Sequence, residues 1–396
     1  MNLQHKNALR RVAVTGLGIV SCAGIGKDAF WAGINGSPPL GIRKVNDFDP
    51  GIYLGPKEVR RTDRFAQMGL AASMMAFEDG GSPSADPKRA GVIVGTGIGG
   101  MITYEQQVMV LHEKGANRVS PFLVTMIMPN AAPAITSMHL GFQGPCETVA
   151  TACASGTHAI SHAANLIAEG RCEIAIGAGT EAAITPVAVA AFANMTALSV
   201  TGISRPFDAM RDGFVIAEGA AALLLEDFQH ATARKAHIYC EIIGTASTAD
   251  AHHITAPAPG GVGATECMRL AISDAGLKPS DIVHINAHGT STPLNDAAES
   301  QAIHKVFGDT PPPVTSIKGI TGHSMGAAGA IEAVAVSLSL QNRQIPPTAG
   351  FETADPEIEL DIVNGSPRKF EPGPVLSNSF GFGGHNGCVV FAPTRS

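Results

Sequence analysis

Short apolar runs rich in valine and isoleucine alternate along the chain with longer segments in which apolar residues recur at helical spacing. The short runs have the length and composition of buried strands, and the longer segments have those of helices that pack on a sheet. We predict strands at 11–16, 91–95, 173–179, 221–226, 238–247, 282–287, 314–317, 375–378 and 388–392. We predict helices at 29–34, 63–77, 131–139, 155–168, 264–275, 296–306 and 327–340. This alternation predicts an α/β fold with largely buried sheets.

The predicted elements also suggest two similar halves. Each half contains strands, a loop with candidate reactive residues after a strand, and an alanine-rich helix that begins with small residues. The two loops are 152–156 (ACASG) and 322–329 (GHSMGAAG). Because the similarity lies in the order of elements and not in a sequence repeat, we expect two halves of related fold, at 1–247 and 248–396.

The composition limits the possible functions. Hydrophobic residues make up 45% of the 396 positions and charged residues 15%, with 45 glycines, as is typical of a tightly packed globular protein. The length fits about two or three domain-sized units. A net charge of −7 argues against general nucleic-acid binding. No apolar run approaches the length of a membrane span, so we expect no membrane partner.

Seven cysteines are scattered along the chain, and no two of them form a C-x-x-C pair. An odd number without paired spacing predicts neither a disulfide framework nor a zinc site. We therefore expect a reduced, cytoplasmic protein.

One cysteine has unusual surroundings. Cys153 precedes three small residues (154–156) and opens a long apolar segment that ends at Gly170. This placement predicts a thiol at the N-terminus of a buried helix, where free N–H groups and the positive end of the helix dipole stabilise the thiolate. A buried cysteine is usually an inert small hydrophobe, so the neighbours carry the argument; Cys388, after a glycine-rich loop, is the second candidate.

Two histidines lie in loops that follow predicted strands. His288 comes after the strand at 282–287, and His323 lies in a glycine-rich loop after the strand at 314–317. Polar residues at the ends of buried strands commonly form sites in α/β proteins. Two neutral imidazoles can each donate one N–H to a carbonyl oxygen that becomes an enolate or oxyanion. A metal site is less well supported, because no third ligand is spaced with them.

Charged residues accompany both histidine loops. Lys318 and Glu332 lie on either side of His323. A cation beside an imidazole opposes its protonation, and Glu332 would hold the lysine in place. Asp296 and Glu299 begin the helix after the first histidine loop and are interpreted mainly as stabilising the N-terminus of that helix.

Two glycine-rich loops carry further signals. The loop at 95–100 matches G-x-G-x-x-G after a strand, but no acidic residue ends a second strand at the required distance, so we do not expect dinucleotide binding. Its glycines are interpreted as allowing tight packing near a pocket. The loop at 380–387 contains Phe380 and Phe382 between two strands. A backbone N–H of this loop would complete an oxyanion hole, and a phenylalanine would cover the pocket.

With these motifs in this order, the chain resembles the β-ketoacyl-acyl-carrier-protein synthases, closest to the elongating type (synthase II) of the thiolase-like superfamily. The resemblance runs nearly end to end, from 14–18 (VTGLG) to 378–384 (NSFGFGG). It implies a five-layered αβαβα fold, a homodimer and a reaction that requires no metal or redox cofactor.

The resemblance also implies a two-stage acyltransferase reaction in fatty-acid elongation. Cys153 would take an acyl chain from an acyl carrier protein as a thioester. His288 and His323 would promote decarboxylation of malonyl-carrier protein and stabilise the enolate, which attacks the acyl carbonyl and gives a chain two carbons longer. The N–H groups of Cys153 and Phe382 match the oxyanion hole, and Phe382 matches the gate. Other matched residues are the substrate contacts Ile98, Thr290, Thr292 and Phe380 and the supporting pair Lys318 and Glu332.

The chain departs from the family pattern where carrier-protein docking is expected. The segments 49–64 and 198–206 look shortened. Asn295 stands where fatty-acid enzymes usually have glycine, and in this it is more like the type II polyketide ketosynthases. The remaining basic residues are a candidate docking patch for an acidic carrier protein: Lys57, Arg60, Arg61, Arg64 and Arg118.

Three alternatives stay open. The first is a type II polyketide ketosynthase that works as a heterodimer with a chain-length-factor partner. The second is a scaffold subunit of a synthase heterodimer, against which the intact Cys153, His288 and His323 argue. The third is a thiolase, which would use coenzyme A and a second catalytic cysteine in its C-terminal loop, where this chain has His385 and Asn386.

Overall fold

Eleven strands form one mixed sheet over the residues that the computed structural model describes, 9–394. The strands follow the order β4-β3-β5-β6-β1-β7-β13-β12-β8-β9, with β2 paired to β1. Their bounds are β1 (Val12–Ser21), β2 (Gly24–Ile25), β3 (Ala90–Gly95), β4 (Cys146–Val149), β5 (Ile174–Glu181), β6 (Gly219–Asp227), β7 (Cys240–Ala249), β8 (His284–Asn286), β9 (Val314–Thr315), β12 (Val375–Gly381) and β13 (His385–Ala392). A separate two-stranded sheet consists of β10 (Gln344–Ile345) and β11 (Arg368–Lys369).

The helices alternate with these strands as the apolar pattern predicts. They are α1 (Lys27–Ile34), α2 (Pro56–Val59), α3 (Arg64–Asp79), α4 (Met101–Lys114), α5 (Leu123–Ile127), α6 (Ala131–Leu140), α7 (Ser155–Ala168), α8 (Pro186–Asn194), α9 (Phe228–Ala233), α10 (Val262–Asp274), α11 (Pro293–Phe307), α12 (Lys318–Thr321) and α13 (Ala328–Asn342). Every predicted strand and helix is present, with its ends shifted by a few residues. The pattern missed α4 and α8 because each buries a single residue, so neither shows an apolar stripe.

The sheet repeats one arrangement of five strands. In the series β1-β6-β5-β3-β4 the neighbours are antiparallel, antiparallel, parallel and parallel. The series β7-β13-β12-β8-β9 has the same sequence of pairings. The two series are joined because β1 also pairs antiparallel with β7. Residue 247 lies inside β7, the first strand of the second series, and we infer that the boundary between the halves lies between α9 and β7.

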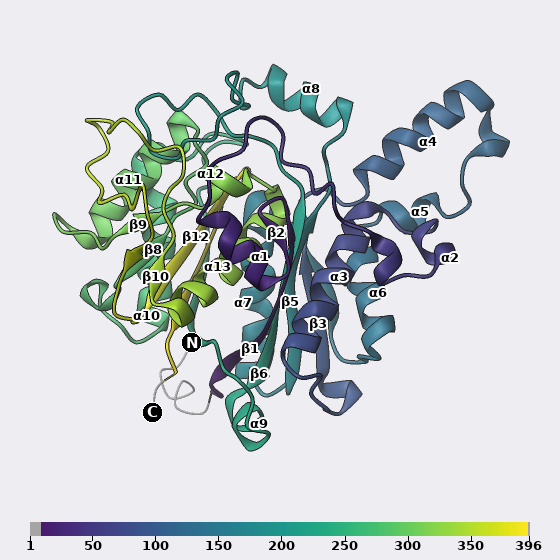
Figure 1. The fold of residues 1–396 in the computed structure, drawn as a ribbon, viewed down its shortest axis with the longest axis horizontal. Helices are drawn as coiled ribbons and strands as arrows, with labels where there is room; N and C mark the ends of the chain where they lie inside the picture. The colour runs from purple at the N-terminus through teal and green to yellow at the C-terminus, as the bar shows by residue number, and fades with distance from the viewer. Residues whose placement is uncertain (1–8, 395–396) are drawn as a thin grey trace.

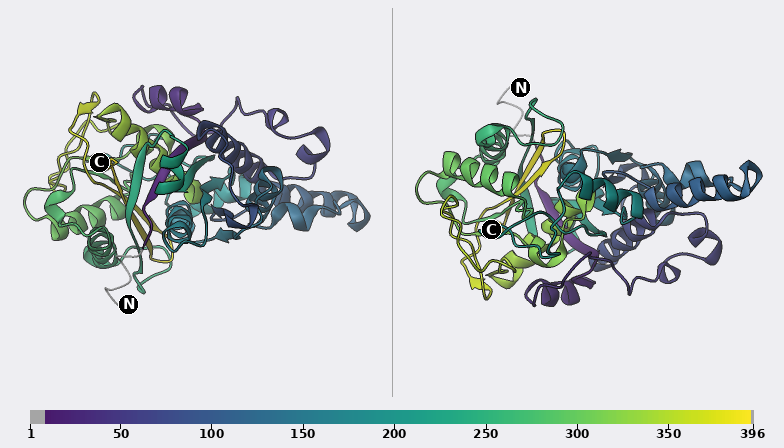
Figure 2. Two further views of the ribbon diagram at one scale, coloured as in Figure 1. Left: turned by 90° about the horizontal axis from the view of Figure 1, so that it is seen from below. Right: turned by 90° about the horizontal axis from the view of Figure 1, so that it is seen from above.

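Helices cover both faces of the two half-sheets and also lie between them. α3 and α6 pack on the outer face of the first half-sheet, and α10 and α11 lie on the outer side of the second. α7 and α13 contact strands of both half-sheets and form the middle layer (Figures 1 and 2). The predicted five-layered αβαβα fold with two pseudo-repeated halves is therefore confirmed.

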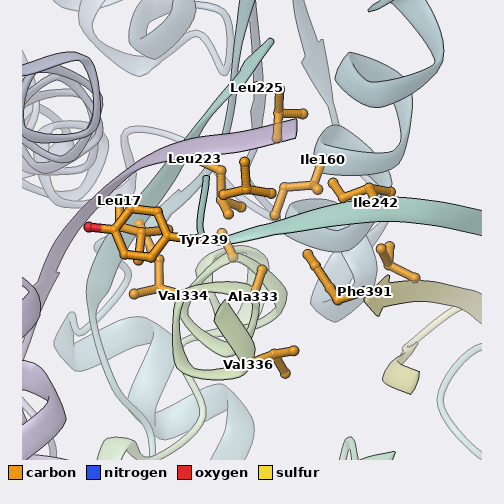
Figure 3. Packing of buried hydrophobic residues seen from close by; sticks show 14 of the residues in the cluster. Leu17, Ile160, Leu223, Leu225, Tyr239, Ile242, Ala333, Val334, Val336 and Phe391 are labelled. Atoms are coloured by element: carbon orange, nitrogen blue, oxygen red, sulfur yellow. The ribbon is translucent and has the colours of Figure 1, made fainter. Parts of the chain in front are cut away.

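The largest core cluster lies in the middle layer. Side chains of α7 and α13 pack there against the inner faces of both half-sheets, for example Ile160 and Val334 against Leu223 and Phe391 (Figure 3). Residues 328–340 of α13 are all buried, as expected for a helix enclosed on every side. Over residues 9–394, no helix combines the length and the apolar character needed to cross a membrane.

Small residues bring the first turns of the two central helices together. A Cβ atom added to Gly156 in α7 would lie 2.8 Å from the backbone nitrogen of Ala330 and 2.9 Å from the carbonyl oxygen of Gly326. Any larger side chain would push the helices apart. The fold thus places the segment before α7, which contains Cys153, against the segment before α13, which contains His323.

Candidate active site

Cys153 lies in a tight turn between β4 and α7. The turn spans Ala152–Ala154, and Ala152 adopts a positive φ of 49°, which non-glycine residues rarely do. The Ser155 hydroxyl donates to the carbonyl oxygen of Ala152 at 2.6 Å and accepts the N–H of Thr151 at 2.9 Å. These bonds hold the strained turn in place and fix the position of the sulfur at the start of α7, as predicted.

The structure brings the cysteine and both predicted histidines together. Nε2 of His323 lies 3.0 Å from Sγ of Cys153. The rings of His288 and His323 meet edge to face, with their centroids 5.3 Å apart. The three residues come from the turn before α7, the loop after β8 and the loop after α12. Segments far apart in the sequence therefore meet at a single site.

These three residues line a cavity of about 540 Å³. The side chains predicted to contact substrate line it as well, together with the predicted gate Phe382: Ile98, Thr290, Thr292 and Phe380. Sequence reasoning missed further apolar lining residues, which are Phe192, Met195, Phe214, Leu294 and Met325. Most of the wall is therefore apolar, which suits an alkyl chain better than a polar metabolite.

The sulfur is less acidic than its position at a helix start led us to expect. Burial raises the pKa of the Cys153 thiol to about 11. The backbone N–H groups of Phe382 and of Cys153 itself, together with the charge of Lys318, oppose this rise without cancelling it. The resting sulfur therefore carries its proton at neutral pH, and the predicted thiolate is not the resting form. The same two N–H groups face the sulfur, where the predicted oxyanion hole requires them.

Both histidines are held in the neutral form. Burial and the nearby Lys318 ammonium lower the pKa of His288 and of His323 well below 6.5. Nδ1 of His323 is buried without a hydrogen-bond partner within residues 9–394. Because an unpaired buried N–H is costly, the favoured tautomer carries its proton on Nε2 and donates it to the sulfur.

Lys318 and Glu332 form a buried ion pair beside the histidines. Nζ of Lys318 donates to the carbonyl oxygen of His288 at 2.6 Å and lies 3.5 Å from Nδ1 of the same residue. Burial raises the pKa of Glu332 to about 7, and Lys318 opposes this rise. The pair thus holds a positive charge against the imidazoles, in the arrangement inferred from the sequence.

Asp296 and Glu299 do more than stabilise a helix end. Both are buried, and Glu299 accepts the backbone N–H groups of His288 and Gly289 at 2.8 Å each. Asp296 accepts the N–H of Thr290 at 2.9 Å. The two carboxylates therefore fix the backbone of the loop that presents His288 and the threonines to the cavity. The signal for this role was their spacing after the loop, which sequence reasoning attributed mainly to the helix.

The G-x-G-x-x-G loop after β3 has no free amides for a phosphate at its centre. The N–H groups of Gly97 and Ile98 donate to the carboxylate of Glu181 at 2.7 and 3.3 Å. Over residues 9–394, no cluster of His, Cys, Asp and Glu side chains is arranged to hold a metal ion.

Comparisons with known proteins agree with this geometry. The profile described as "Beta-ketoacyl synthase, N-terminal domain" matches residues 38–231, and "Beta-ketoacyl synthase, C-terminal domain" matches residues 239–352. The chain belongs to the β-ketoacyl synthase family. Its curated relatives include a "3-oxoacyl-[acyl-carrier-protein] synthase 2" of Synechocystis sp., which is 43% identical over 98% of this chain and 99% of the relative. A protein of the same name from Coxiella burnetii is 40% identical over 97% and 98%.

Solved structures of similar fold include other ketosynthases. The ishigamide ketosynthase/chain length factor matches this β-ketoacyl synthase with a TM-score of 0.93 and 32% identity, over 98% of this chain and all of that one. A type II polyketide ketosynthase, solved with its acyl-carrier protein and bound to the hexaketide, matches with a TM-score of 0.88 and 30% identity over the same shares.

The residues of the predicted docking patch differ in their surroundings. Lys57, Arg60, Arg61 and Arg118 are exposed. The guanidinium group of Arg61 lies 4.3 Å from the ring centroid of Phe122, just before α5. This contact connects the two segments of the patch. By contrast, the half-buried Arg64 pairs with Glu218 at 2.8 Å. Arg64 therefore has a structural partner in this β-ketoacyl synthase, and the other four residues present the accessible charge.

Proposed function

We propose that this β-ketoacyl synthase catalyses the decarboxylating Claisen condensation of an acyl chain, carried on Cys153, with malonyl-acyl-carrier protein during fatty-acid elongation. The observation that carries the proposal is the meeting of one cysteine sulfur with two neutral imidazoles in a largely apolar cavity. The names of relatives at 40–43% identity support the fatty-acid pathway. The loss of CO2 drives formation of the carbon–carbon bond, so the proposal invokes no cofactor.

In the first stage the sulfur of Cys153 attacks the thioester carbonyl of an acyl-carrier protein. The S–C bond to Cys153 forms, the bond to the carrier's thiol breaks, and the proton of the cysteine thiol ends on the departing thiol. The N–H groups of Cys153 and Phe382 stabilise the oxyanion of the tetrahedral intermediate. The hydrogen bond from Nε2 of His323 stabilises the sulfur as it loses its proton.

In the second stage malonyl-carrier protein enters the same cavity. Its carboxylate leaves as CO2, and the electron pair of the broken bond forms an enolate at the thioester. The N–H groups of His288 and His323 donate to the enolate oxygen, since Lys318 and burial keep both rings neutral. The enolate carbon then attacks the acyl carbonyl on Cys153, and the C–S bond breaks to give the β-ketoacyl product and the Cys153 thiolate. The thiolate takes up one proton from solvent and returns to the resting thiol.

Carrier protein and a second copy of the chain are the proposed partners. Exposed apolar side chains gather on the arm of α4 and α5, which projects from the body (Figures 1 and 2). They include Tyr104, Val108, Met109, Leu111 and Val124. Patches of this kind usually mark a protein interface, which supports a homodimer. A chain-length-factor-like subunit on the same arm is the alternative. All seven cysteines are free, which suits the reducing cytoplasm.

A mass-spectrometric condensation assay tests the proposal. Acyl-carrier proteins with saturated chains of increasing length are mixed with malonyl-carrier protein and the enzyme. We expect each accepted chain to appear on the carrier as a β-ketoacyl group two carbons longer. Repeated condensation without reduction of the keto group would instead assign the polyketide reaction, which the similar solved ketosynthases favour. Condensation with coenzyme A thioesters alone would assign a thiolase.

The pH dependence of malonyl decarboxylation follows from the neutral histidines. Because the pKa of each ring lies well below 6.5, both stay unprotonated as the pH falls through that value. Burial raises the pKa of Glu332 to about 7, but its protonation leaves the Lys318 charge beside the rings in place. We therefore expect the decarboxylation rate to stay flat between about pH 8 and pH 5.5. In Lys318→Met the opposing charge is gone, so the pKa of both rings rises and the rate starts to fall at higher pH. A wild-type midpoint near 6.5, measured by CO2 release, would contradict this assignment.

Charge reversal of the exposed patch tests carrier docking. We expect the double variant Arg60→Glu/Arg61→Glu to raise KM for acyl-carrier protein by about tenfold at low salt, with kcat little changed. Arg269→Glu, on the exposed face of α10, is the matched control and is expected to leave KM unchanged. Equal KM values for the double variant and wild type would remove these arginines from the docking surface.

A further inference from the structure

A carboxylate outside the predicted set of site residues lies behind the cavity wall, against the backbone of the lining residue Ile98 and of Gly326, next to the lining residue Met325. Glu181 ends β5 and is fully buried, yet it pairs with no Lys, Arg or His side chain within the described part of the chain. It accepts instead from the Thr96 hydroxyl at 3.0 Å and from the N–H groups of Gly97 at 2.7 Å, Ile98 at 3.3 Å and Gly326 at 3.1 Å. Burying an unpaired charge costs free energy, so these hydrogen-bond donors must stabilise the carboxylate in place of a cation.

These donors belong to two different loops of the site. Gly97 directly precedes Ile98, which lines the cavity, in the loop after β3. Gly326 directly follows Met325, which also lines the cavity and adopts a positive φ of 47°, in the segment after His323. One carboxylate thus joins the wall on the Ile98 side to the segment that carries a catalytic histidine.

The two loops pack against each other at Glu181 without free space. A Cβ atom added to Gly326 would lie 2.4 Å from the nitrogen of Gly97, and one added to Gly97 would lie 2.9 Å from Oε2 of Glu181. The two loops are therefore in backbone contact across the carboxylate. Neither loop can shift without breaking hydrogen bonds to a buried charge, which is expensive.

The carboxylate also acts electrostatically on the nucleophile. Three ionisable groups influence the Cys153 sulfur: His323 by its hydrogen bond, Lys318 by lowering the pKa of the thiol, and Glu181 by raising it. Burial raises the pKa of Glu181 itself to about 7, while its hydrogen bonds oppose the rise. Above that pH, Glu181 is therefore a negative charge close enough to be felt at the sulfur.

We propose that Glu181 is a positioning residue that holds the cavity wall at Ile98 and Met325 at a fixed position relative to His323. By fixing this wall, Glu181 sets the chain-length preference of acyl loading. The chain-length part rests on the proposed function, since it requires that an acyl chain occupies the cavity. The amides of the G-x-G-x-x-G loop then serve to anchor this wall. A change at Glu181 moves apolar atoms of the cavity wall. In an apolar pocket, a difference of one methylene between two substrates changes the ratio of their kcat/KM values by about tenfold or more.

Glu181→Gln tests the proposal with a nearly isosteric change. The amide turns an NH2 group toward N–H donors, so one loop loses its acceptor. We expect the ratio of kcat/KM for long over short acyl-carrier proteins to change by about tenfold in the loading step. We also expect the pH midpoint for alkylation of Cys153 by iodoacetamide to fall by about one pH unit, because a nearby negative charge is removed. Alkylation needs no carrier protein, so this readout stands even if the proposed function fails.

Glu226→Gln is the matched control. Glu226 is equally buried and lies in β6, the strand next to β5. In the register of these two strands Glu226 is opposite Ile174 at the start of β5, whereas Glu181 is at the end of β5, opposite Gly219. We expect this control to change neither the chain-length ratio nor the alkylation profile. A folded Glu181→Gln protein with both quantities as in wild type would overturn the proposal.

Glu181→Asp provides the second variant if the glutamine protein does not fold. It keeps the charge but cannot reach both loops, because it is one methylene shorter. We expect the alkylation midpoint to stay within about 0.3 pH units of wild type while the chain-length ratio changes. A wild-type ratio in Glu181→Asp would also contradict the positioning role.

Discussion

Replacing Cys153 by alanine is expected to abolish acyl loading while leaving the fold intact. The change removes one sulfur atom from a turn whose backbone is held by Ser155, so little packing is lost. Loss of a nucleophile removes covalent catalysis altogether, and a fall in rate of about 10⁶ is the scale to expect. Intact-mass spectrometry after incubation with acyl-carrier protein measures the covalent adduct directly.

Cys388→Ala is the matched control for this prediction. Cys388 was the second candidate in the sequence, and its side chain is buried in the core cluster of the second half, where it contacts Asn378 at 3.3 Å. It lies outside the residues that line the cavity, so we expect normal loading. Detection of an acylated Cys153→Ala protein, or loss of loading in Cys388→Ala, would refute the assignment of the nucleophile.

His288→Ala and His323→Ala are each expected to load acyl chains but to stall at condensation. Each change removes one N–H donor from the enolate, and removal of such a donor typically costs about 10²–10³ in rate. His323→Ala also loses the hydrogen bond to the sulfur, so its loading should be slower than that of His288→Ala. Loading is followed by intact mass, and malonyl decarboxylation is followed separately by CO2 release.

His284, in the strand that precedes the His288 loop, provides the control for these two variants. His284 lies in β8, is buried, and has neither ring nitrogen paired within residues 9–394. Burial lowers its pKa to about 3. His284→Leu should load and decarboxylate as wild type does. Normal malonyl decarboxylation in His288→Ala or His323→Ala would remove that residue from the enolate site.

The sequence predicts those parts of the fold that bury an apolar stripe. Strands such as β5 and helices such as α7 and α13 are enclosed, so their composition alone indicates them. α4 and α8 expose most of their residues, and the chain pattern cannot separate them from polar or irregular segments. The five-layered arrangement was implied by the resemblance alone. The apolar pattern could not predict it, because no local pattern specifies how half-sheets stack.

The candidate site divides in the same way. Cys153, His288 and His323 lie in motifs with small neighbours at strand and helix ends, and such local signals survive in a sequence. The pKa of the thiol cannot be predicted from the sequence, because it depends on how completely surrounding segments bury the sulfur. The role of Glu181 was also hidden, since its partners lie in loops more than 80 residues before it and more than 140 after it.

A single-turnover chase follows the acyl group from Cys153 to the carrier protein. Acyl-Cys153 enzyme is isolated free of acyl-carrier protein and mixed with malonyl-carrier protein labelled with ¹³C at the methylene carbon. We expect the acyl group to leave the enzyme as a β-ketoacyl chain on the carrier, with the label between its two carbonyl groups and with release of one CO2 per chain. Release of the free fatty acid with no labelled product, or an acyl-enzyme that persists, would contradict it.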